Sequence, residues 1–231
     1  MAPVFNQSSL LWADAQARVA DVVGASADPP MLVRAERALR QAQQKWNNYH
    51  PWSWLTATCT ASANASGMFA LPSDFRTLYD IIWQGDPRRL YYLEPRLYDQ
   101  LRPNNEGGTP THYSLFSVGA TGMLSLYPPI SGGSLSLRYW RRMNYGSVAS
   151  ASGALDLPED FESAFLALAK YYFLVDKGGD PERVASWKEE GFGGMNQARS
   201  MEQHQPDQVS TLLPGYLADS PGWNPNSTVG L

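Results

Sequence analysis

The sequence predicts an α+β protein: an α-helical bundle built from the N- and C-terminal segments, with an inserted antiparallel β domain and an extended C-terminal tail. Apolar residues recur at steps of three and four near both chain ends, whereas Thr56 to about Tyr145 reads as short alternating segments. The last residues show neither period and contain several prolines. We therefore expect a helical bundle domain from 1–55 and 147–204, an inserted β domain at 56–146 and an arm at 205–231.

Two helices are expected before the β domain. The first covers 9–23, with Ser8 or Ser9 as its cap and Gly24 as its stop. The second covers 31–49, after the start signal of Asp28 and two prolines, and its apolar face recurs every three or four residues.

The second helix is predicted to end at an aromatic cluster. Pro51 cannot continue a helix and favours an extended His50. Trp46, Trp52 and Trp54 then lie where the chain passes from helix to strand. We take this transition as the centre of the fold.

Short linkers between the strands predict an antiparallel meander. Residues 95–101 are expected to form one helical turn among these strands. The expected strands are 56–60, 68–71, 76–83, 88–93, 112–118, 123–127 and 134–143.

Two further helices are expected at 158–177 and 180–203. Pro158 precedes acidic residues that suit a first helical turn. Gly191, Gly193 and Gly194 interrupt the second of these helices. Each glycine costs about 1 kcal/mol relative to alanine in a helix interior, so we expect a kink or break there.

A five-residue phrase occurs twice, as LPSDF at 71–75 and LPEDF at 157–161. Its aspartates, Asp74 and Asp160, are a candidate carboxylate pair for glycoside cleavage. A structural role explains the phrase better: a proline, an acidic turn and a buried Phe dock a helical turn onto a sheet edge.

Other candidate chemistry lacks a convergent set of groups. His50, His112 and His204 are scattered, and Cys59 is the only cysteine. No glycine-rich phosphate loop is recognisable. We therefore expect no catalytic residues, no cofactor and no metal.

Basic and aromatic residues gather at the end of the last predicted strand: Arg138, Trp140, Arg141 and Arg142. This group suits the acidic face of a neighbouring subunit, a solvated sheet edge or DNA phosphates, and we favour the subunit contact.

The arm at 205–231 offers spaced apolar anchors for binding a partner. These anchors are Leu212, Leu213, Tyr216, Leu217 and Trp223.

Taken in order, several phrases resemble the head-to-tail adaptor (connector) proteins of tailed bacteriophages. They span about residues 8–200 and leave the arm outside. The phrases are AQQKWN at 42–47, WSWL at 52–55, FALPSDF at 69–75, GTPTHY at 108–113, LYPP at 126–129, LRYW at 137–140 and LPEDF at 157–161.

The resemblance implies a virion structural protein that is not an enzyme. It implies a ring of identical subunits, a dodecamer, that docks below the portal protein, extends the DNA channel and provides the platform for tail or nozzle proteins. Genomic DNA would pass through without sequence-specific binding, and no membrane would be involved. The protein would assemble in the host cytoplasm and reside in the virion neck, between capsid portal and tail.

Two rival functions remain open. One is a tail-side neck protein. The other is a carbohydrate-binding or cell-wall-degrading tail component that uses Trp83, Tyr91, Tyr92 and Trp140 as sugar platforms.

Overall fold

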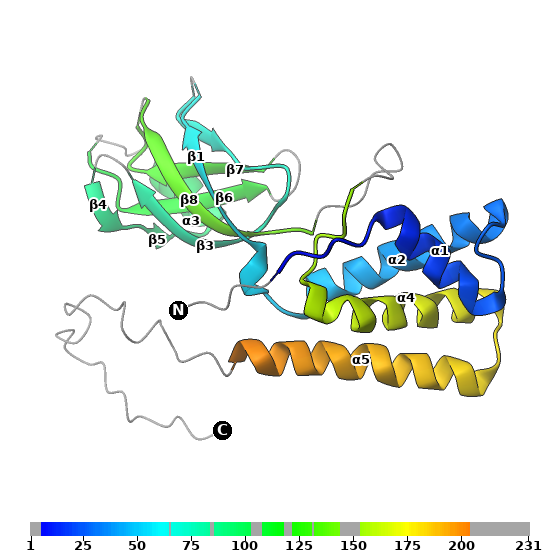
Figure 1. Ribbon diagram of the computed structural model, residues 1–231. Coiled ribbons are helices and arrows are strands. Elements are labelled where there is room, and N and C mark those ends of the chain that lie inside the picture. Colours follow the sequence, from blue (N-terminus) through cyan, green and yellow to red (C-terminus); the bar gives the residue numbers. More distant parts are fainter. Residues whose placement is uncertain are drawn as a thin grey trace.

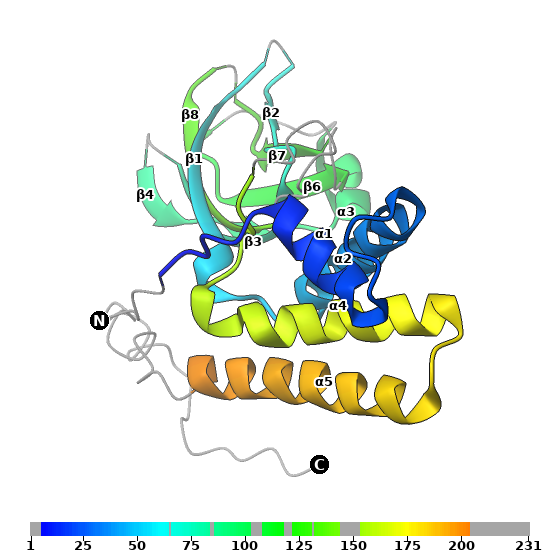
Figure 2. The same cartoon turned by 45° about the vertical axis from the view of Figure 1, so that its right-hand side comes forward.

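The protein has a helical body and a β body that lie beside each other (Figures 1 and 2). The computed structural model describes residues 6–64, 66–83, 86–102, 108–117, 122–130, 132–143 and 153–203. One cluster of buried hydrophobic side chains lies mainly in the helices and a second lies in the strands. The protein therefore has the α+β class that the sequence predicts.

Segments from both ends of the sequence share the core of the helical body. Helix α4 contacts both α2 and α5 and lies between them in both views (Figures 1 and 2). The helices are α1 (Trp12–Ala20), α2 (Pro29–Tyr49), α4 (Glu162–Lys177) and α5 (Pro181–Gln203), with the short 3-10 turns η1 (Asp21–Val23), η2 (Ser53–Leu55) and η5 (Glu159–Phe161).

Helix α1 begins three residues later than its sequence suggests, and neither serine caps it. The preceding segment is extended and pairs with the returning chain: the Ser8 N–H donates to the Leu157 carbonyl at 2.9 Å, and the Leu155 N–H donates to the Leu10 carbonyl at 2.9 Å. The Ser8 hydroxyl instead donates to the Glu162 carboxylate. Pairing with a distant segment therefore overrides the local capping signal.

Helix α2 follows its sequence signals closely. Asp28 is the extended residue before the helix, the two prolines occupy its first turn, and it ends at Tyr49. The predicted apolar face is buried, and Ala35, Leu39 and Trp46 have no exposed surface. This burial, more than intrinsic propensity, stabilises the helix.

Helix α5 runs without a break through its glycines, so the predicted interruption is wrong. A Cβ at Gly191 would lie 2.7 Å from the backbone nitrogen of Leu168 in α4, and a Cβ at Gly194 would overlap Ala164. Two of the three glycines therefore allow α4 and α5 to pack closely. This packing offsets their low helix propensity.

The β body consists of two four-stranded sheets with the orders β1-β8-β3-β4 and β2-β7-β6-β5. Helix α3 (Pro95–Leu101) is the single helix assigned between the strands in the described part of the chain. The strands are β1 (Thr56–Ser62), β2 (Met68–Ala70), β3 (Phe75–Trp83), β4 (Asp86–Arg89), β5 (Tyr91–Tyr92), β6 (His112–Ser117), β7 (Met123–Tyr127) and β8 (Ser134–Arg141).

The predicted meander is wrong, although the strands themselves lie close to their predicted positions. Strand β8 lies between β1 and β3, antiparallel to both, and β5 pairs in parallel with β6. Alternation in β8 buries Leu135, Leu137 and Tyr139 on one face, as expected. That alternation determines which face is buried but not which strands become neighbours, because pairing partners lie far apart in the sequence.

The repeated phrase forms the same turn twice. The Phe75 N–H donates to the Pro72 carbonyl at 3.0 Å, and the Phe161 N–H donates to the Pro158 carbonyl at 3.0 Å. Both phenylalanines are buried. The second copy leads into helix, as predicted, whereas the first leads directly into strand β3.

The predicted aromatic cluster forms where α2 meets the first strand. The rings of Trp52 and Trp54 stack with centroids 4.6 Å apart, and Trp46 lies 5.1 Å from Trp52. The Trp52 indole N–H donates to the Trp46 carbonyl at 2.9 Å. Phe161 from the C-terminal half packs against Trp54 with centroids 5.3 Å apart, so the cluster joins both halves of the chain.

Candidate functional site

The strongest candidate for a partner-binding surface is the exposed side of the β1-β8-β3 sheet. We call it the outer sheet face and define it by Thr58, Tyr79, Ile82, Arg138 and Trp140. Arg138 and Trp140 alternate with the buried Leu137 and Tyr139, so they lie on the opposite side of β8. Tyr79 is 46% exposed and Ile82 is 44% exposed, which is high for side chains of this size.

Aromatic and cationic groups on the outer sheet face contact one another. The Tyr79 and Trp140 rings meet edge to face with centroids 4.9 Å apart. The Arg138 guanidinium carbon lies 5.7 Å from the centroid of Tyr79. A preformed, partly exposed group of aromatic residues with one arginine has the composition of a protein-binding surface.

The other two arginines of the predicted group do not share this face. Arg141 is half-buried and makes a bidentate contact with Asp156, in which Nη2 donates to Oδ1 at 2.7 Å. These hydrogen bonds raise the pKa of the Arg141 guanidinium above its ordinary value. Arg142 is exposed, and its backbone N–H donates to the Asp74 carbonyl at 2.7 Å. Arg141, the last residue of β8, therefore links the sheet to the segment that precedes α4.

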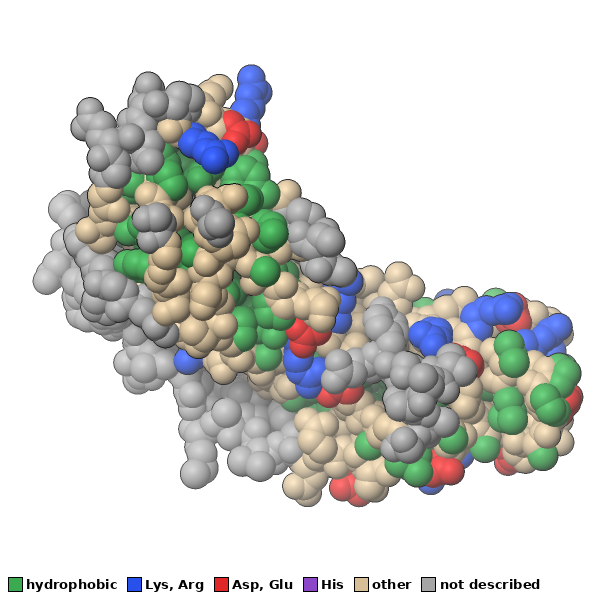
Figure 3. Space-filling model, turned by 90° about the horizontal axis from the view of Figure 1, so that it is seen from above, with side chains coloured by type: hydrophobic (Ala, Val, Ile, Leu, Met, Phe, Trp, Pro, Cys, Tyr) green, Lys and Arg blue, Asp and Glu red, His purple; other side chains and the backbone are tan. Residues whose placement is uncertain are grey.

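Seen from above, hydrophobic side chains and charged side chains of both signs are visible on both bodies (Figure 3). Large exposed hydrophobic side chains likewise occur on the strands, at Tyr79 and Ile82, and on the helices, at Val33 and Val175. The outer sheet face is distinguished by the contacts among its aromatic and cationic groups rather than by exposed apolar surface alone.

A polar network ties the end of α5 to the junction between the two bodies. The Glu202 carboxylate accepts hydrogen bonds from the Ser53 N–H at 2.8 Å and the Ser53 hydroxyl at 2.7 Å. Its other oxygen lies 3.2 Å from Nε2 of His50. Arg76 of β3 donates to the His50 carbonyl at 3.1 Å. The end of α5, the η2 turn and strand β3 thus meet at His50.

The candidate carboxylate pair is not assembled as a catalytic site. Asp74 accepts a hydrogen bond from the Tyr139 hydroxyl at 3.0 Å. Burial and this hydrogen bond raise the pKa of Tyr139 well above its usual range. Asp160 is exposed and lines a hollow of about 190 Å³ between the start of α4 and α5, and the residues lining that hollow do not include Asp74.

The remaining titratable candidates have structural surroundings. Burial raises the pKa of the Cys59 thiol, and the charge of Asp74 adds to this, so the thiolate is disfavoured. His50 pairs with Glu202, and the His112 ring lies 2.9 Å from the Thr111 hydroxyl. Among the residues whose placement is described, no group of three or more His, Cys, Asp or Glu side chains could hold a metal ion.

The aromatic residues considered as sugar platforms are dispersed. Trp83 packs over Gly133, whose φ of 94° is in the left-handed region. Trp140 lies against Tyr79, whereas Tyr91 and Tyr92 are exposed on β5 and contact His112 and Tyr113. The four residues therefore do not form one continuous platform.

The apolar anchors Leu212, Leu213, Tyr216, Leu217 and Trp223 lie outside the described residues, as does the rest of the arm at 205–231. Within the described ranges, no helix is long and apolar enough to cross a membrane.

Three residues of these surfaces escaped the sequence reasoning. Tyr79 and Ile82 lie in a strand, FRTLYDIIW, whose apolar and polar residues do not alternate regularly, so their exposure is not evident from the pattern. Glu202 lies near the end of a helix with a weak apolar stripe. A register assignment for β3 against β8 would have found Ile82, which pairs with Ser136 and so shares a face with Arg138, but not Tyr79, which lies at a bulge between Leu78 and Asp80.

Comparison with known proteins gives one family. The family model described as SU10 adaptor protein matches residues 11–213. The match includes the helices of both chain ends and the whole β body. No curated protein matches the chain.

Proposed function

Because the chain belongs to the SU10 adaptor protein family, we propose that it is a head-to-tail adaptor of a tailed bacteriophage, a structural protein of the virion rather than an enzyme. The observation that carries this proposal is the family match over residues 11–213, which is most of the chain. The assignment agrees with the resemblance found in the ordered sequence phrases.

The proposed position is the virion neck. There, identical subunits form a ring, a dodecamer, that docks below the portal protein and extends the DNA channel. The other side of the ring provides the attachment platform for tail or nozzle proteins. Genomic DNA passes through the channel without sequence-specific contacts.

The outer sheet face supports a role in assembly. Tyr79, Trp140 and Arg138 form a preformed group in which Tyr79 and Arg138 are exposed and Trp140 is half-buried in the single chain. Burying these aromatic rings against another protein gains hydrophobic free energy without ordering flexible side chains. We assign this face to contact with a neighbouring subunit, and its arginine suits an acidic patch.

We propose that folding and docking depend on different segments of the chain, a division of labour between the folded domains and the arm. The helical domain from 1–55 and 147–204 and the β domain from 56–146 provide the folded subunit. The arm at 205–231 docks to the portal through its apolar anchors.

Deletion of 205–231 tests this division. The midpoint of thermal unfolding should stay nearly unchanged, while binding to the portal should be abolished in a pull-down with purified portal protein. A large fall in the unfolding midpoint would contradict the division, because the arm would then belong to the folded core.

Cryo-electron microscopy of purified particles tests the proposed position. Density traced to this chain should form a ring between the portal and the tail. A ring that touches only tail components would instead identify a tail-side neck protein, and density in a fibre or at the tail tip would refute the adaptor function.

A further inference from the structure

Helix α5 carries an exposed glycine that no contact within the described chain explains. Gly191 and Gly194 face α4, where a Cβ would collide with Leu168 or Ala164. A Cβ at Gly193, in contrast, would have no neighbouring atom within 4 Å. Glycine lowers helix stability relative to alanine, so its presence here calls for another reason. Close approach of a second chain provides one.

Gly193 belongs to an acidic surface that we call the α5 outer face: Glu182, Ser186, Glu189 and Gly193. These residues are exposed and recur at steps of three and four. Neither glutamate has an oppositely charged residue three or four positions away in the helix. Among the described residues, neither makes an ion pair.

Helix α2 carries the complementary charge on its α2 outer face, formed by Pro30, Arg34, Arg37, Gln41 and Gln44. These residues are also exposed and follow the same helical spacing. Arg34 and Arg37 are three residues apart, so their like charges repel along the helix.

Carboxylates inside the chain neutralise this face only weakly. Arg40, which follows Arg37 by three residues, pairs instead with Glu36 at 2.7 Å. Within the part of the chain that the structure describes, Arg34 pairs with a single carboxylate, Asp176 of α4, at 4.0 Å, and both side chains are more than two-fifths exposed. An exposed pair at that distance stabilises little.

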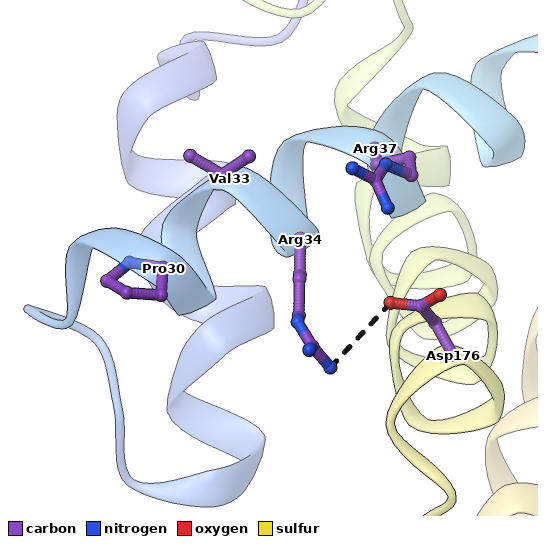
Figure 4. A pocket seen from close by; sticks show the side chains of 5 residues that line it. All are labelled: Pro30, Val33, Arg34, Arg37 and Asp176. Carbon is purple, nitrogen blue, oxygen red and sulfur yellow. Dashed lines mark ion pairs between the residues drawn. The ribbon is translucent and has the colours of Figure 1, made fainter.

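The α2 outer face is hollowed where the arginines lie. A hollow of about 430 Å³ is lined by Pro30, Val33, Arg34, Arg37 and Asp176. Figure 4 shows Arg34 pointing toward Asp176, with Arg37 one turn further along the same helix. Val33, beside them, is 57% exposed. The face therefore offers space, apolar surface and positive charge together.

We propose that the α5 outer face of one copy packs against the α2 outer face of the next copy, with Glu182 and Glu189 facing Arg34 and Arg37. This inference rests on the proposed ring. The two faces lie on different helices, and α4 contacts both α2 and α5 and lies between them in both views (Figures 1 and 2), so the faces are distinct patches. A head-to-tail contact between distinct patches is what closes a ring.

Charge reversal on the full-length chain tests the pairing. Glu182→Lys with Glu189→Lys, and Arg34→Glu with Arg37→Glu, should each weaken self-association on the order of a hundredfold in sedimentation velocity. The quadruple variant carrying all four changes should recover association. The control Arg18→Glu with Arg96→Glu changes exposed residues away from both faces and should associate like the wild type.

Gly193→Gln tests the close approach independently. The side chain enters open space in the single copy, so helicity and the unfolding midpoint should be equal to or above those of the wild type. Self-association should nevertheless weaken about tenfold or more. Lys188→Gln, at an exposed position off the α5 outer face, should leave association unchanged.

The outcomes separate this interface from the proposed function. If particle imaging shows a ring but the folded double variants associate like the wild type, or the quadruple variant fails to recover, the interface is overturned and the adaptor function stands. A wild-type chain that stays monomeric at its highest soluble concentration also overturns the interface. If the particles contain single copies rather than a ring, both the interface and the proposed ring are refuted.

Discussion

The tryptophans of the helical body and the aromatic residues of the β body differ in what they contact. Trp46 and Trp52 are fully buried and stack within one cluster that joins both halves of the sequence. Trp140 and Tyr79 meet edge to face on the outside of a sheet. The same kind of side chain therefore fills a core in one region and lies on an outer surface in the other.

Replacing Trp52 by alanine should have the largest effect on stability. The change removes a fully buried indole and its hydrogen bond to the Trp46 carbonyl. The free energy of unfolding should fall by about 3–5 kcal/mol, measured by urea denaturation. A loss as small as that of an exposed aromatic residue would contradict the comparison.

Gly191→Ala should have the next largest effect. Its Cβ would lie 2.7 Å from the Leu168 backbone, so α4 and α5 would have to separate. We expect a loss of about 1–3 kcal/mol in the free energy of unfolding. Gly193→Ala is the matched control and should instead stabilise the single copy by up to about 1 kcal/mol. Equal effects at the two positions would show that α4 does not determine the glycine requirement.

Tyr79→Ala with Trp140→Ala should change binding far more than folding. Both side chains lie on the outer sheet face, so the free energy of unfolding should fall by no more than about 1 kcal/mol. Self-association, followed by light scattering, should be strongly reduced. Unchanged assembly would remove this face from the subunit contact and leave it a solvated surface.

His50→Gln should have the smallest effect, visible only as a pH dependence. Burial, with a contribution from Arg199, holds the pKa of His50 below its ordinary value of 6.5, although Glu202 opposes this. The fold favours neutral His50, so its stabilisation is complete above pH 6.5 and is lost as the pH falls through the lowered pKa. The variant should therefore lose less stability than the wild type between pH 8 and pH 5. Identical pH profiles in urea denaturation would contradict this.

Local signals account for most of the helices and strands. The prolines after Asp28 begin α2, and Gly178, in the left-handed region with a φ of 71°, ends α4. The alternation in β8 correctly separates Arg138 and Trp140 from the buried Leu137 and Tyr139. Such signals act over a few residues, which is why they are legible in a single sequence.

The candidate site was only half predictable. Arg138 and Trp140 lie on the same outer side of β8, as their alternation predicts, but Arg141 is held by Asp156, fifteen positions later. Tyr79 completes the outer sheet face from a strand more than fifty residues earlier. Neither contact can be predicted from the residues that neighbour it in the sequence.

By itself, the sequence determined the α+β class, most helices and strands, and the cluster of tryptophans at the junction, because periodicity and turn residues encode these features locally. Only the tertiary structure decided the order of the strands, the continuity of α5 and the separation of the four basic and aromatic residues. These depend on contacts between distant segments, where packing against Leu168 or pairing with Asp156 outweighs the propensity of any single stretch.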